Sequence, residues 1–350
     1  MKILYGLSGE GFGHSSRAKT ILPYLEKKGH EVKIMTYGQA SKVLKREGSG
    51  VFDIRGMHIV FRKGSIRKRE TLFSGLKSFA SNLKKNEKIR KLMKNNFDLC
   101  ITDMEPLASI LSFWHKIPLL CIDNQHRLVN MELRVPRKYY HDFLIAKLVT
   151  KAFVPRADWY IVTTFANGRI KNKYRKNTFL VPPLIRQVIK ESAPKKGESI
   201  LVYLTKKNHK LLGTLKHINR NFLVYGWDTE KKDGNLVFRK SGNRFTEDLA
   251  KCKAIIATAG FTLISEALYL KKPYFALPLK GQFEQTLNAL FLKRSKLGEY
   301  SDNPDKQSIA YFLDNLEEYR KKLNKYNPDY DLLFKKLDFV LDQVSKNEGK

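Results

Sequence analysis

The segment LSGEGFGHSSR, residues 7–17, combines a glycine-rich turn with a histidine, two features that together can bind a ligand and move a proton. An apolar run precedes it and a helical pattern follows it, so the glycines form a strand-to-helix turn of the kind that binds phosphate. His14 stands where a dinucleotide-binding GxGxxG turn has its third glycine, and the second predicted strand ends in Thr36 and Tyr37 without an acidic residue. NAD binding is therefore disfavoured, and a P-loop is excluded because no Lys-Ser/Thr pair follows the turn.

His14 is the residue of this turn that can act as a general base. We expect Gly11 and Gly13 to let the backbone approach a ligand, while His14 lies at the N-terminus of the following helix. The helix dipole disfavours a cation there, so a neutral imidazole is available to accept a proton. A histidine that caps the helix through ordinary hydrogen bonds fits the same position equally well.

A second set of polar residues follows the predicted strand that ends at Thr258. The small-residue turn 259–262 opens a helix whose free N–H groups suit a diphosphate, and Glu266 within that helix can accept from a ribose diol. Carboxylate and amide side chains that can bind sugar hydroxyls follow the next strand, namely Gln282, Glu284, Gln285 and Asn288. Each of them alone also fits a solvated helix start, but their order together predicts a nucleotide-sugar site.

Apolar runs of strand length alternate with helical patterns along most of the chain, which predicts parallel βαβ units and an α/β fold. The predicted strands are 2–7, 31–37, 98–102, 118–122, 159–163, 199–204, 221–225, 235–238, 254–258 and 273–277. The predicted helices are 16–28, 40–47, 105–115, 246–252, 262–269, 283–296, 306–324 and 329–346. Pro182 and Pro183 enforce extended chain at a break between two such patterns. We therefore expect doubly wound domains over residues 1–183 and 184–325, and a C-terminal helix, 326–350, that packs on the first domain.

The composition bounds the class of protein. The 350 residues include 66 Lys and Arg against 34 Asp and Glu, which gives a net charge of +32. The three cysteines form neither a disulfide framework nor a CxxC metal site, so we expect a reduced, cytoplasmic protein. No apolar run is long enough for a membrane span, and the first one is a strand instead of a signal peptide. The charge attracts anionic partners, unless lysine is simply spread over every exposed face.

Part of the positive charge is concentrated. Residues 61–96 carry twelve Lys and Arg against two Glu, with apolar residues at helical spacing, which is typical of a basic amphipathic helix on anionic lipid. Residues 131–156 also mix bulky apolar side chains with Arg and Lys. Together the two segments predict a surface on the first domain that faces an anionic membrane. A buried helix with a solvated face is the alternative.

The order TLISE, LPLKGQFEQ and NA within residues 257–289 resembles the nucleotide-sugar-binding segment of GT-B glycosyltransferases. The peptidoglycan N-acetylglucosaminyltransferase group, which is glycosyltransferase family 28-like, and its relatives in teichoic-acid-type and archaeal glycosylation are the most similar. GEGFGHSSRA resembles the GxGxGH loop of that group, and DMEPLA, IDNQH and VPPLIR are similar to a less-studied branch of it. The resemblance covers the whole chain and implies two Rossmann-like doubly wound domains that face a cleft.

The resemblance also implies an inverting glycosyltransferase that needs no essential metal or cofactor and uses a nucleotide diphosphate sugar, mostly a UDP-sugar. The donor residues that it implies are Gly260, Phe261 and Thr262 for the diphosphate, Glu266 for the ribose, Glu284 and Gln285 with Gln282 and Asn288 for the sugar, and Phe245 for the nucleobase. His14 is then the acceptor-side base, and Asp103 or Glu105 orients it or acts as the base itself. A glycine loop of the second domain is replaced by residues 204–207, where Lys206 or Lys207 can bind the phosphates.

Two other functions fit parts of the sequence. A non-hydrolysing UDP-sugar epimerase shares the fold, but it needs acid and base groups around the sugar ring and no lipid-facing surface. A nucleic-acid-binding protein would use the positive charge, but no RNP, KH, zinc-finger or helix-turn-helix signature accompanies it. We therefore expect a UDP-sugar donor, a glycan or lipid-linked acceptor, no specific nucleic acid, and an enzyme that is cytoplasmic or peripheral on the inner face of the cell membrane.

Overall fold

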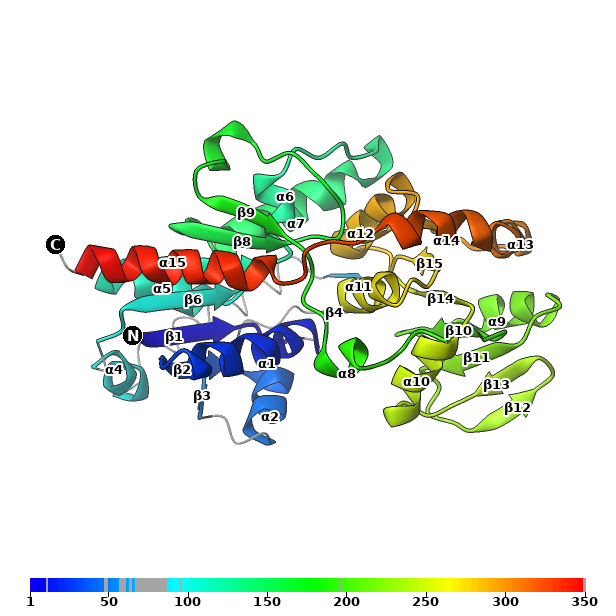
Figure 1. The fold of residues 1–350 in the computed structure, drawn as a ribbon, viewed down its shortest axis with the longest axis horizontal. Coiled ribbons are helices and arrows are strands. Elements are labelled where there is room, and N and C mark those ends of the chain that lie inside the picture. The colour runs from blue at the N-terminus through cyan, green and yellow to red at the C-terminus, as the bar shows by residue number, and fades with distance from the viewer. Residues whose placement is uncertain are drawn as a thin grey trace. The chain divides into compact units, whose positions relative to one another are not determined.

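The computed structural model of the chain describes residues 1–10, 12–46, 50–56, 61–62, 65–66, 87–94, 96–195 and 197–348. The chain divides into two compact units (Figure 1). Unit 1 comprises Met1–Leu184 and Tyr330–Lys350, and unit 2 comprises Ile185–Asp329. Each unit has a sheet in which nearly all of the strand pairs are parallel, with helices packed on it, so the predicted α/β fold is confirmed.

The sheet of unit 1 is parallel throughout its described strands, in the order β3-β2-β1-β6-β7-β8-β9. These strands are β1 (Lys2–Leu7), β2 (Glu31–Thr36), β3 (Val51–Asp53), β6 (Leu99–Asp103), β7 (Leu119–Asp123), β8 (Trp159–Thr163) and β9 (Thr178–Val181). The strand order reverses between β1 and β6, whose last residues, Leu7 and Asp103, lie opposite each other in the register. Open parallel sheets bind ligands outside the carboxyl ends of the strands at such a switch point.

Helices cover both faces of this sheet. In a buried parallel sheet the side chains on both faces are apolar, so each face needs a layer of helices. One face packs against α1 (Phe12–Lys27), α2 (Gly38–Arg46) and α15 (Leu332–Glu348). The other packs against α4 (Glu87–Met93), α5 (Pro106–His115) and α7 (Tyr140–Phe153). Unit 1 also contains the short strands β4 (Phe61–Arg62) and β5 (Ser65–Ile66), α6 (Arg127–Asn130), and the 3-10 turns η1 (Arg137–Tyr139) and η2 (Asn172–Tyr174).

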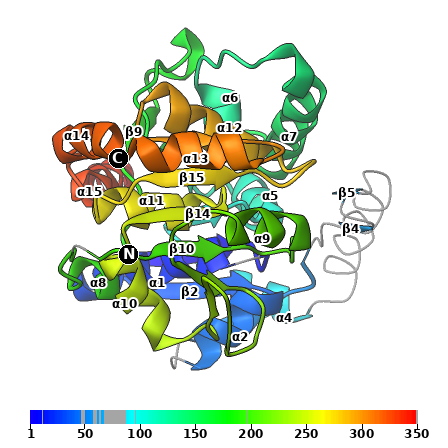
Figure 2. The same ribbon diagram turned by 90° about the vertical axis from the view of Figure 1, so that its right-hand side faces the viewer.

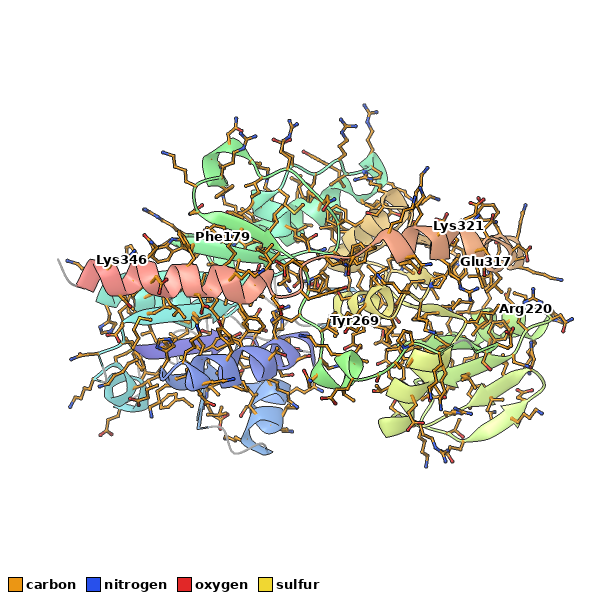
Figure 3. All side chains as sticks on the ribbon, viewed as in Figure 1. Phe179, Arg220, Tyr269, Glu317, Lys321 and Lys346 are labelled. Atoms are coloured by element: carbon orange, nitrogen blue, oxygen red, sulfur yellow. The ribbon has the colours of Figure 1, made fainter. Side chains whose placement is uncertain are left out.

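The C-terminal helix α15 belongs to unit 1, although 145 residues of unit 2 precede it in the chain. Its apolar residues recur at helical spacing and are buried against the sheet, namely Leu333, Leu337, Val340, Leu341 and Val344. At the edge of the same contact, Phe179 of β9 (Figure 3) meets Phe339 edge to face, with ring centroids 5.6 Å apart. The Lys336 ammonium lies 5.1 Å from the centre of the Phe179 ring, within the range of a cation–π contact.

The sheet of unit 2 has the order β12-β13-β11-β10-β14-β15-β16, and β12 is antiparallel to β13 while the other described pairs are parallel. Its strands are β10 (Ile200–Tyr203), β11 (Phe222–Tyr225), β12 (Lys231–Asp233), β13 (Leu236–Phe238), β14 (Ala254–Thr258), β15 (Tyr274–Leu277) and β16 (Gly298–Tyr300). The helices are α8 (Gln187–Lys190), α9 (His209–Lys216), α10 (Asn243–Lys251), α11 (Phe261–Tyr269), α12 (Phe283–Arg294), α13 (Lys306–Asp314) and α14 (Leu316–Lys325). Figure 2 shows β10, β14 and β15 side by side, and the switch point of this sheet lies between β10 and β14.

The structure differs from the predicted elements at several points. The helix predicted over 306–324 is two helices that meet at Asn315, whose side chain donates to the Tyr311 carbonyl at 2.7 Å. Helix α1 begins at Phe12 instead of Ser16, so His14 lies within its first turn. The strands β3, β9, β12 and β16 were not predicted.

The predicted basic amphipathic helix within residues 61–96 lies mostly outside the described residues. Its described apolar residues, Ile89 and Leu92 of α4, are buried in the core of unit 1 and do not face solvent. In the part of the chain that the structure describes, no helix has the length and apolar character required to span a bilayer.

Candidate active site

His14 and Asp103 meet at the switch point of unit 1. Asp103 ends β6, and His14 lies in the first turn of α1, the helix that follows β1. Nδ1 of His14 is 2.8 Å from Oδ1 of Asp103, whose side chain is fully buried, whereas 12% of the His14 side chain is exposed. An ionised carboxylate can only accept hydrogen bonds, so Nδ1 carries a proton in this contact, and in a neutral imidazole Nε2 then has the lone pair.

Arg17 binds the same carboxylate from one helical turn further along α1. Its Nε donates to Oδ2 and its NH2 group to Oδ1, both at 2.8 Å, and the guanidinium is buried. Burial alone would raise the pKa of Asp103, but the charge of Arg17 and the contacts with His14 outweigh burial and hold that pKa well below its usual range. Sequence reasoning missed Arg17, although residues three apart on a helix share one face.

The backbone on either side of Asp103 is fixed by hydrogen bonds. The amide of Ser8 donates to the Asp103 carbonyl at 3.0 Å, and the Thr102 hydroxyl donates to the Glu105 carbonyl at 2.8 Å. Met104, which lies between Asp103 and Glu105, has a φ of 54°. This left-handed conformation costs a non-glycine residue about 1–3 kcal/mol. These contacts hold the strained turn, and the turn directs Asp103 toward α1.

Glu105, the other acidic residue predicted near His14, caps helix α5. Its carboxylate accepts from the amides of Leu107 at 3.1 Å and Ala108 at 2.6 Å. Burial raises the pKa of Glu105 to about 7, although these two hydrogen bonds lower it. Asp103 is therefore the one of the two acidic residues that contacts His14, and Glu105 holds the N-terminus of α5 beside it.

The glycine turn itself is partly structural. A Cβ atom on Gly9 would lie 2.1 Å from the Tyr37 carbonyl, so the chain can pass there only without a side chain. Gly13 lies in the first turn of α1 and is half-buried. Gly11 lies outside the described residues.

A buried cluster at the end of β7 contains Cys121, Asp123 and His126, residues whose side chains can ligate a metal. The distances suit hydrogen bonds: Asp123 Oδ2 is 2.7 Å from His126 Nδ1 and 3.4 Å from the Cys121 sulfur. Burial and the charge of Asp123 raise the pKa of the Cys121 thiol well above its usual value, so the thiol keeps the proton that it donates. The segment IDNQH thus supplies a hydrogen-bonded network beside Asp103.

In unit 2 a cavity of about 310 Å³ opens at the carboxyl edge of the sheet. Its lining comes from the loop after β10, from the end of β14, and from the loops after β15 and β16, including Lys206, Lys207, His209, Thr258, Leu279 and Ser301. Thr205 joins two of these loops, because both its amide and its hydroxyl lie 3.1 Å from the Thr258 hydroxyl. The cavity therefore lies at the switch point of the second sheet.

The turn between β14 and α11 leaves the N-terminus of α11 open on one side. Gly260 caps this helix without a side-chain hydrogen bond, and a Cβ atom built on it would meet only the Thr258 carbonyl, at 4.0 Å. Asn288 is fully buried and donates to the Ala259 carbonyl at 3.0 Å, so α12 supports this turn. Phe261 and Thr262 form the first turn of α11, at the positive end of the helix dipole.

Glu266, the predicted ribose ligand, is paired with an arginine that sequence reasoning missed. Nε and NH2 of Arg186 donate to the two carboxylate oxygens at 2.5 and 2.8 Å. The Glu266 side chain is buried and the Arg186 side chain is 39% exposed. Arg186 stands in VPPLIR, so this motif reaches the residue that the resemblance assigns to the donor.

Of the residues predicted to bind the donor, Lys206 and Lys207 line the cavity, and the others are not among its lining residues. Gln285 accepts from the Leu279 amide at 3.0 Å and donates to the Gln282 side chain at 2.7 Å, which braces the loop after β15. Glu284 lies in the first turn of α12 and is half-buried. Phe245 meets the rings of Tyr203 and Tyr225 edge to face, at 5.5 and 5.0 Å.

Residues 1–317, most of both units, match the model of glycosyl transferase family 1. The chain belongs to this family. The sequence predicted a glycosyltransferase, and this prediction is confirmed. Among curated proteins, this glycosyltransferase is similar to an uncharacterized glycosyltransferase of Methanosarcina acetivorans, with 24% identity over 93% of each chain. It is also similar to the UDP-N-acetylglucosamine–N-acetylmuramyl-(pentapeptide) pyrophosphoryl-undecaprenol N-acetylglucosamine transferase 3 of Bacillus cereus, with 27% identity over 33% of this chain and 35% of that protein.

Solved structures confirm the GT-B fold of this glycosyltransferase. The structure of Phytolacca americana UGT2 complexed with UDP-2fluoro-glucose and pterostilbene matches it with a TM-score of 0.69 and 13% identity, over 99% of each chain. The glycosyltransferase SnogD of Streptomyces nogalater matches with a TM-score of 0.63 and 15% identity, over 97% of this chain and 99% of that one. The predicted resemblance to GT-B enzymes and to the peptidoglycan transferases is thus confirmed.

Proposed function

We propose that this glycosyltransferase moves a sugar from a UDP-sugar to a hydroxyl group of its acceptor, with inversion at the anomeric carbon and with His14 as the general base. The contact of His14 Nδ1 with Asp103 Oδ1 at 2.8 Å carries this proposal, because it leaves Nε2 free to accept the hydroxyl proton. In the reaction the acceptor oxygen bonds to the anomeric carbon, the bond from that carbon to the UDP oxygen breaks, and the proton passes to His14. One base suffices for such a single displacement.

The donor binds to unit 2 in this proposal. The N-terminus of α11 offers its N–H groups and the positive end of its dipole to the diphosphate, and Lys206 and Lys207 add positive charge at the neighbouring loop. Gly260 leaves the space beside this helix end open. These groups stabilise the negative charge of the departing UDP, so an essential metal ion is not required. Two similar proteins support UDP as the nucleotide: the structure of Phytolacca americana UGT2 is a complex with UDP-2fluoro-glucose, and the Bacillus cereus relative is named for UDP-N-acetylglucosamine.

Glu266 binds the ribose, Glu284 and Gln285 bind the sugar, and Phe245 lies by the nucleobase. Because Arg186 donates to both Glu266 oxygens, the carboxylate is held in one orientation, and each oxygen keeps a second lone pair for a ribose hydroxyl. Gln282 and Asn288 support the loops that carry these residues.

We further propose a lipid-linked acceptor at an anionic membrane. Tyr140, Leu144 and Leu148 recur every four residues on α7 and are exposed, Leu148 by 68%. The cations Lys138, Lys147 and Lys151 lie on the same segment. Phe113 and Trp114, also exposed, end α5, which contacts α7 on the same face of the sheet. Apolar side chains bordered by lysines match an anionic bilayer surface, and the Bacillus cereus relative is named for an undecaprenol-linked substrate.

The proposed reaction is tested by product analysis with UDP-sugars, in the absence and presence of hydroxyl acceptors that include polyprenyl-diphosphate sugars. We expect UDP and a glycosylated acceptor of inverted anomeric configuration, formed in the presence of chelator. An epimerised UDP-sugar formed without acceptor would contradict the proposal, and so would a product that retains the donor configuration.

A further inference from the structure

We propose that Arg17 is a positioning residue that keeps Asp103 ionised and thereby decides which nitrogen of His14 faces the acceptor. This inference rests on the proposed function of His14 as the base. It assigns a role to a residue that was not predicted from the sequence. It also explains why the Asp103 carboxylate has two hydrogen-bond donors, His14 and Arg17, instead of one.

Two nitrogen atoms converge on one carboxylate oxygen. Oδ1 of Asp103 lies 2.8 Å from both His14 Nδ1 and the NH2 group of Arg17, and these two nitrogens are 3.2 Å apart. Arginine can only donate, and an ionised carboxylate can only accept. Both nitrogens therefore direct a hydrogen at Oδ1, which requires the proton of the neutral imidazole to lie on Nδ1. Nε2 is then the nitrogen with a lone pair.

A protonated Asp103 would reverse this arrangement. Its hydroxyl could donate to Nδ1, and the imidazole proton would move to Nε2, where it blocks general-base catalysis. Whether His14 can act as a base thus depends on the ionisation of a carboxyl group that has no exposed surface.

Burial by itself favours the protonated carboxyl group, because an ion without a partner is costly to remove from water. The surroundings add to this cost: Tyr5 of β1 and Cys121 and Asp123 of β7 also interact electrostatically with Asp103, and Asp123 carries a second negative charge. Arg17 supplies the permanent positive charge, through two parallel hydrogen bonds to both oxygens. His14, neutral before it accepts the proton, does not supply that charge.

The direct test is the tautomer of His14, observed by ¹⁵N NMR at neutral pH and assigned by comparison with His14→Gln. The variants are Arg17→Met, which removes charge and donors, Arg17→Lys, which keeps the charge, and Lys19→Met, which removes an exposed cation from the same helix. We expect the Nδ1–H form in the wild type, Arg17→Lys and Lys19→Met, and a shift to the Nε2–H form in Arg17→Met. An unchanged tautomer in folded Arg17→Met would overturn the proposal.

Kinetics give a second readout. We expect kcat to fall about 100-fold in Arg17→Met with the KM for the donor unchanged, and Arg17→Lys to recover about tenfold of this loss. The pH–rate profile of Arg17→Met should gain an ionisation that the wild type lacks, because Asp103 then titrates in the measured range. A parallel fall in kcat at all pH values, with no new ionisation, would indicate a merely structural role and contradict the proposal.

Two other outcomes can be told apart: a variant that does not fold, and a wild-type protein that transfers no sugar. If Arg17→Met does not fold, Arg17→Gln, which keeps two N–H donors but no charge, replaces it in the NMR test with the same expected shift. If the wild type transfers no sugar, the proposed function fails, while the tautomer measurement still decides the role of Arg17.

Discussion

The Asp103 carboxylate accepts a hydrogen bond from His14 at 2.8 Å, although the two residues are 89 positions apart in the sequence. The contact exists because β1 and β6 are adjacent and parallel, so the loop after one strand and the last residue of the other reach the same edge of the sheet. The base that we propose and the carboxylate that we propose orients it are thereby placed at the switch point of unit 1.

The first prediction concerns the acid of this pair. Asp103→Asn replaces the acceptor by an amide that can donate to Nδ1, so the imidazole proton moves to Nε2 and kcat should fall by about 100-fold or more. The matched control is Asp158→Asn, since Asp158 accepts from the Leu119 amide at the other edge of the same sheet. Equal losses in both variants would mean that Asp103 has only a structural role.

The second prediction concerns the N-terminus of α11. Gly260→Val places a side chain where the protein has no atom within 4 Å except the Thr258 carbonyl. We expect a melting temperature within a few degrees of the wild type and loss of the thermal shift caused by UDP. Gly213→Val is the control, because Gly213 of α9 also has open space around it. A UDP shift that survives in Gly260→Val would place the diphosphate elsewhere.

The third prediction separates ribose recognition from fold support at Glu266. If the carboxylate binds both ribose hydroxyls, the wild type should bind UDP about tenfold more tightly than 2′-deoxy-UDP, a loss of about 1.4 kcal/mol. Glu266→Gln should bind the two nucleotides with similar affinity. Calorimetric titration measures both constants. A preference for UDP that persists in Glu266→Gln would show that another group reads the ribose.

The fourth prediction concerns the pH dependence of stability. Burial raises the pKa of Glu105 from 4.5 to about 7 in the folded protein. Between these values the folded state holds a proton that the unfolded state has lost, so stability is full below pH 4.5 and falls as the pH rises to 7. The loss is about 3 kcal/mol as an upper value. Glu105→Gln should remove this contribution, which urea unfolding at pH 5 and pH 8 would detect as a smaller decrease than in the wild type. An identical decrease in both proteins would contradict the prediction.

The fifth prediction concerns the exposed face of α7. The double variant Leu144→Asp/Leu148→Asp adds negative charge to a surface that we propose binds anionic lipid, so co-sedimentation with phosphatidylglycerol vesicles should fall several-fold. Tyr311→Asp, at an exposed position of α13 in unit 2, should bind vesicles as the wild type does. Binding that is unaffected by the double variant, or equally strong with neutral vesicles, would exclude this face as the docking surface.

The fold class could be predicted because the periodicity of apolar residues and the Gly and Pro residues that end helices and strands are local signals in the sequence. The start of α1 was predicted at Ser16, four residues after its actual start at Phe12, because the glycines near Phe12 are typical of a loop. Among the three-residue strands, β13 was predicted and β16 was not, because the residues of β13 are all apolar whereas β16 contains Gly298 and Glu299.

Candidate site residues could be named from the sequence where the residue type and its local position both indicate a role. They could not be named where the contact partner comes from a distant segment of the chain. His14 was named as a candidate from its place after a glycine turn at the start of a helix, Glu266 from its place within the helix after the second turn, and Asp103 through the family resemblance. Arg17 and Arg186 were not, because an ion pair with a buried carboxylate depends on which strands are neighbours and not on local sequence. Glu105 was found as an acidic residue, but its role as the cap of α5 is visible only in the structure.

The central claim, that His14 is the base of a transfer reaction, is tested most directly by His14→Ala measured in two ways. UDP binding, followed by thermal shift, should equal that of the wild type, since the donor is proposed to bind unit 2. Formation of the glycosylated acceptor under single-turnover conditions should fall by about 10³-fold. Transfer at the wild-type rate in His14→Ala would contradict the account.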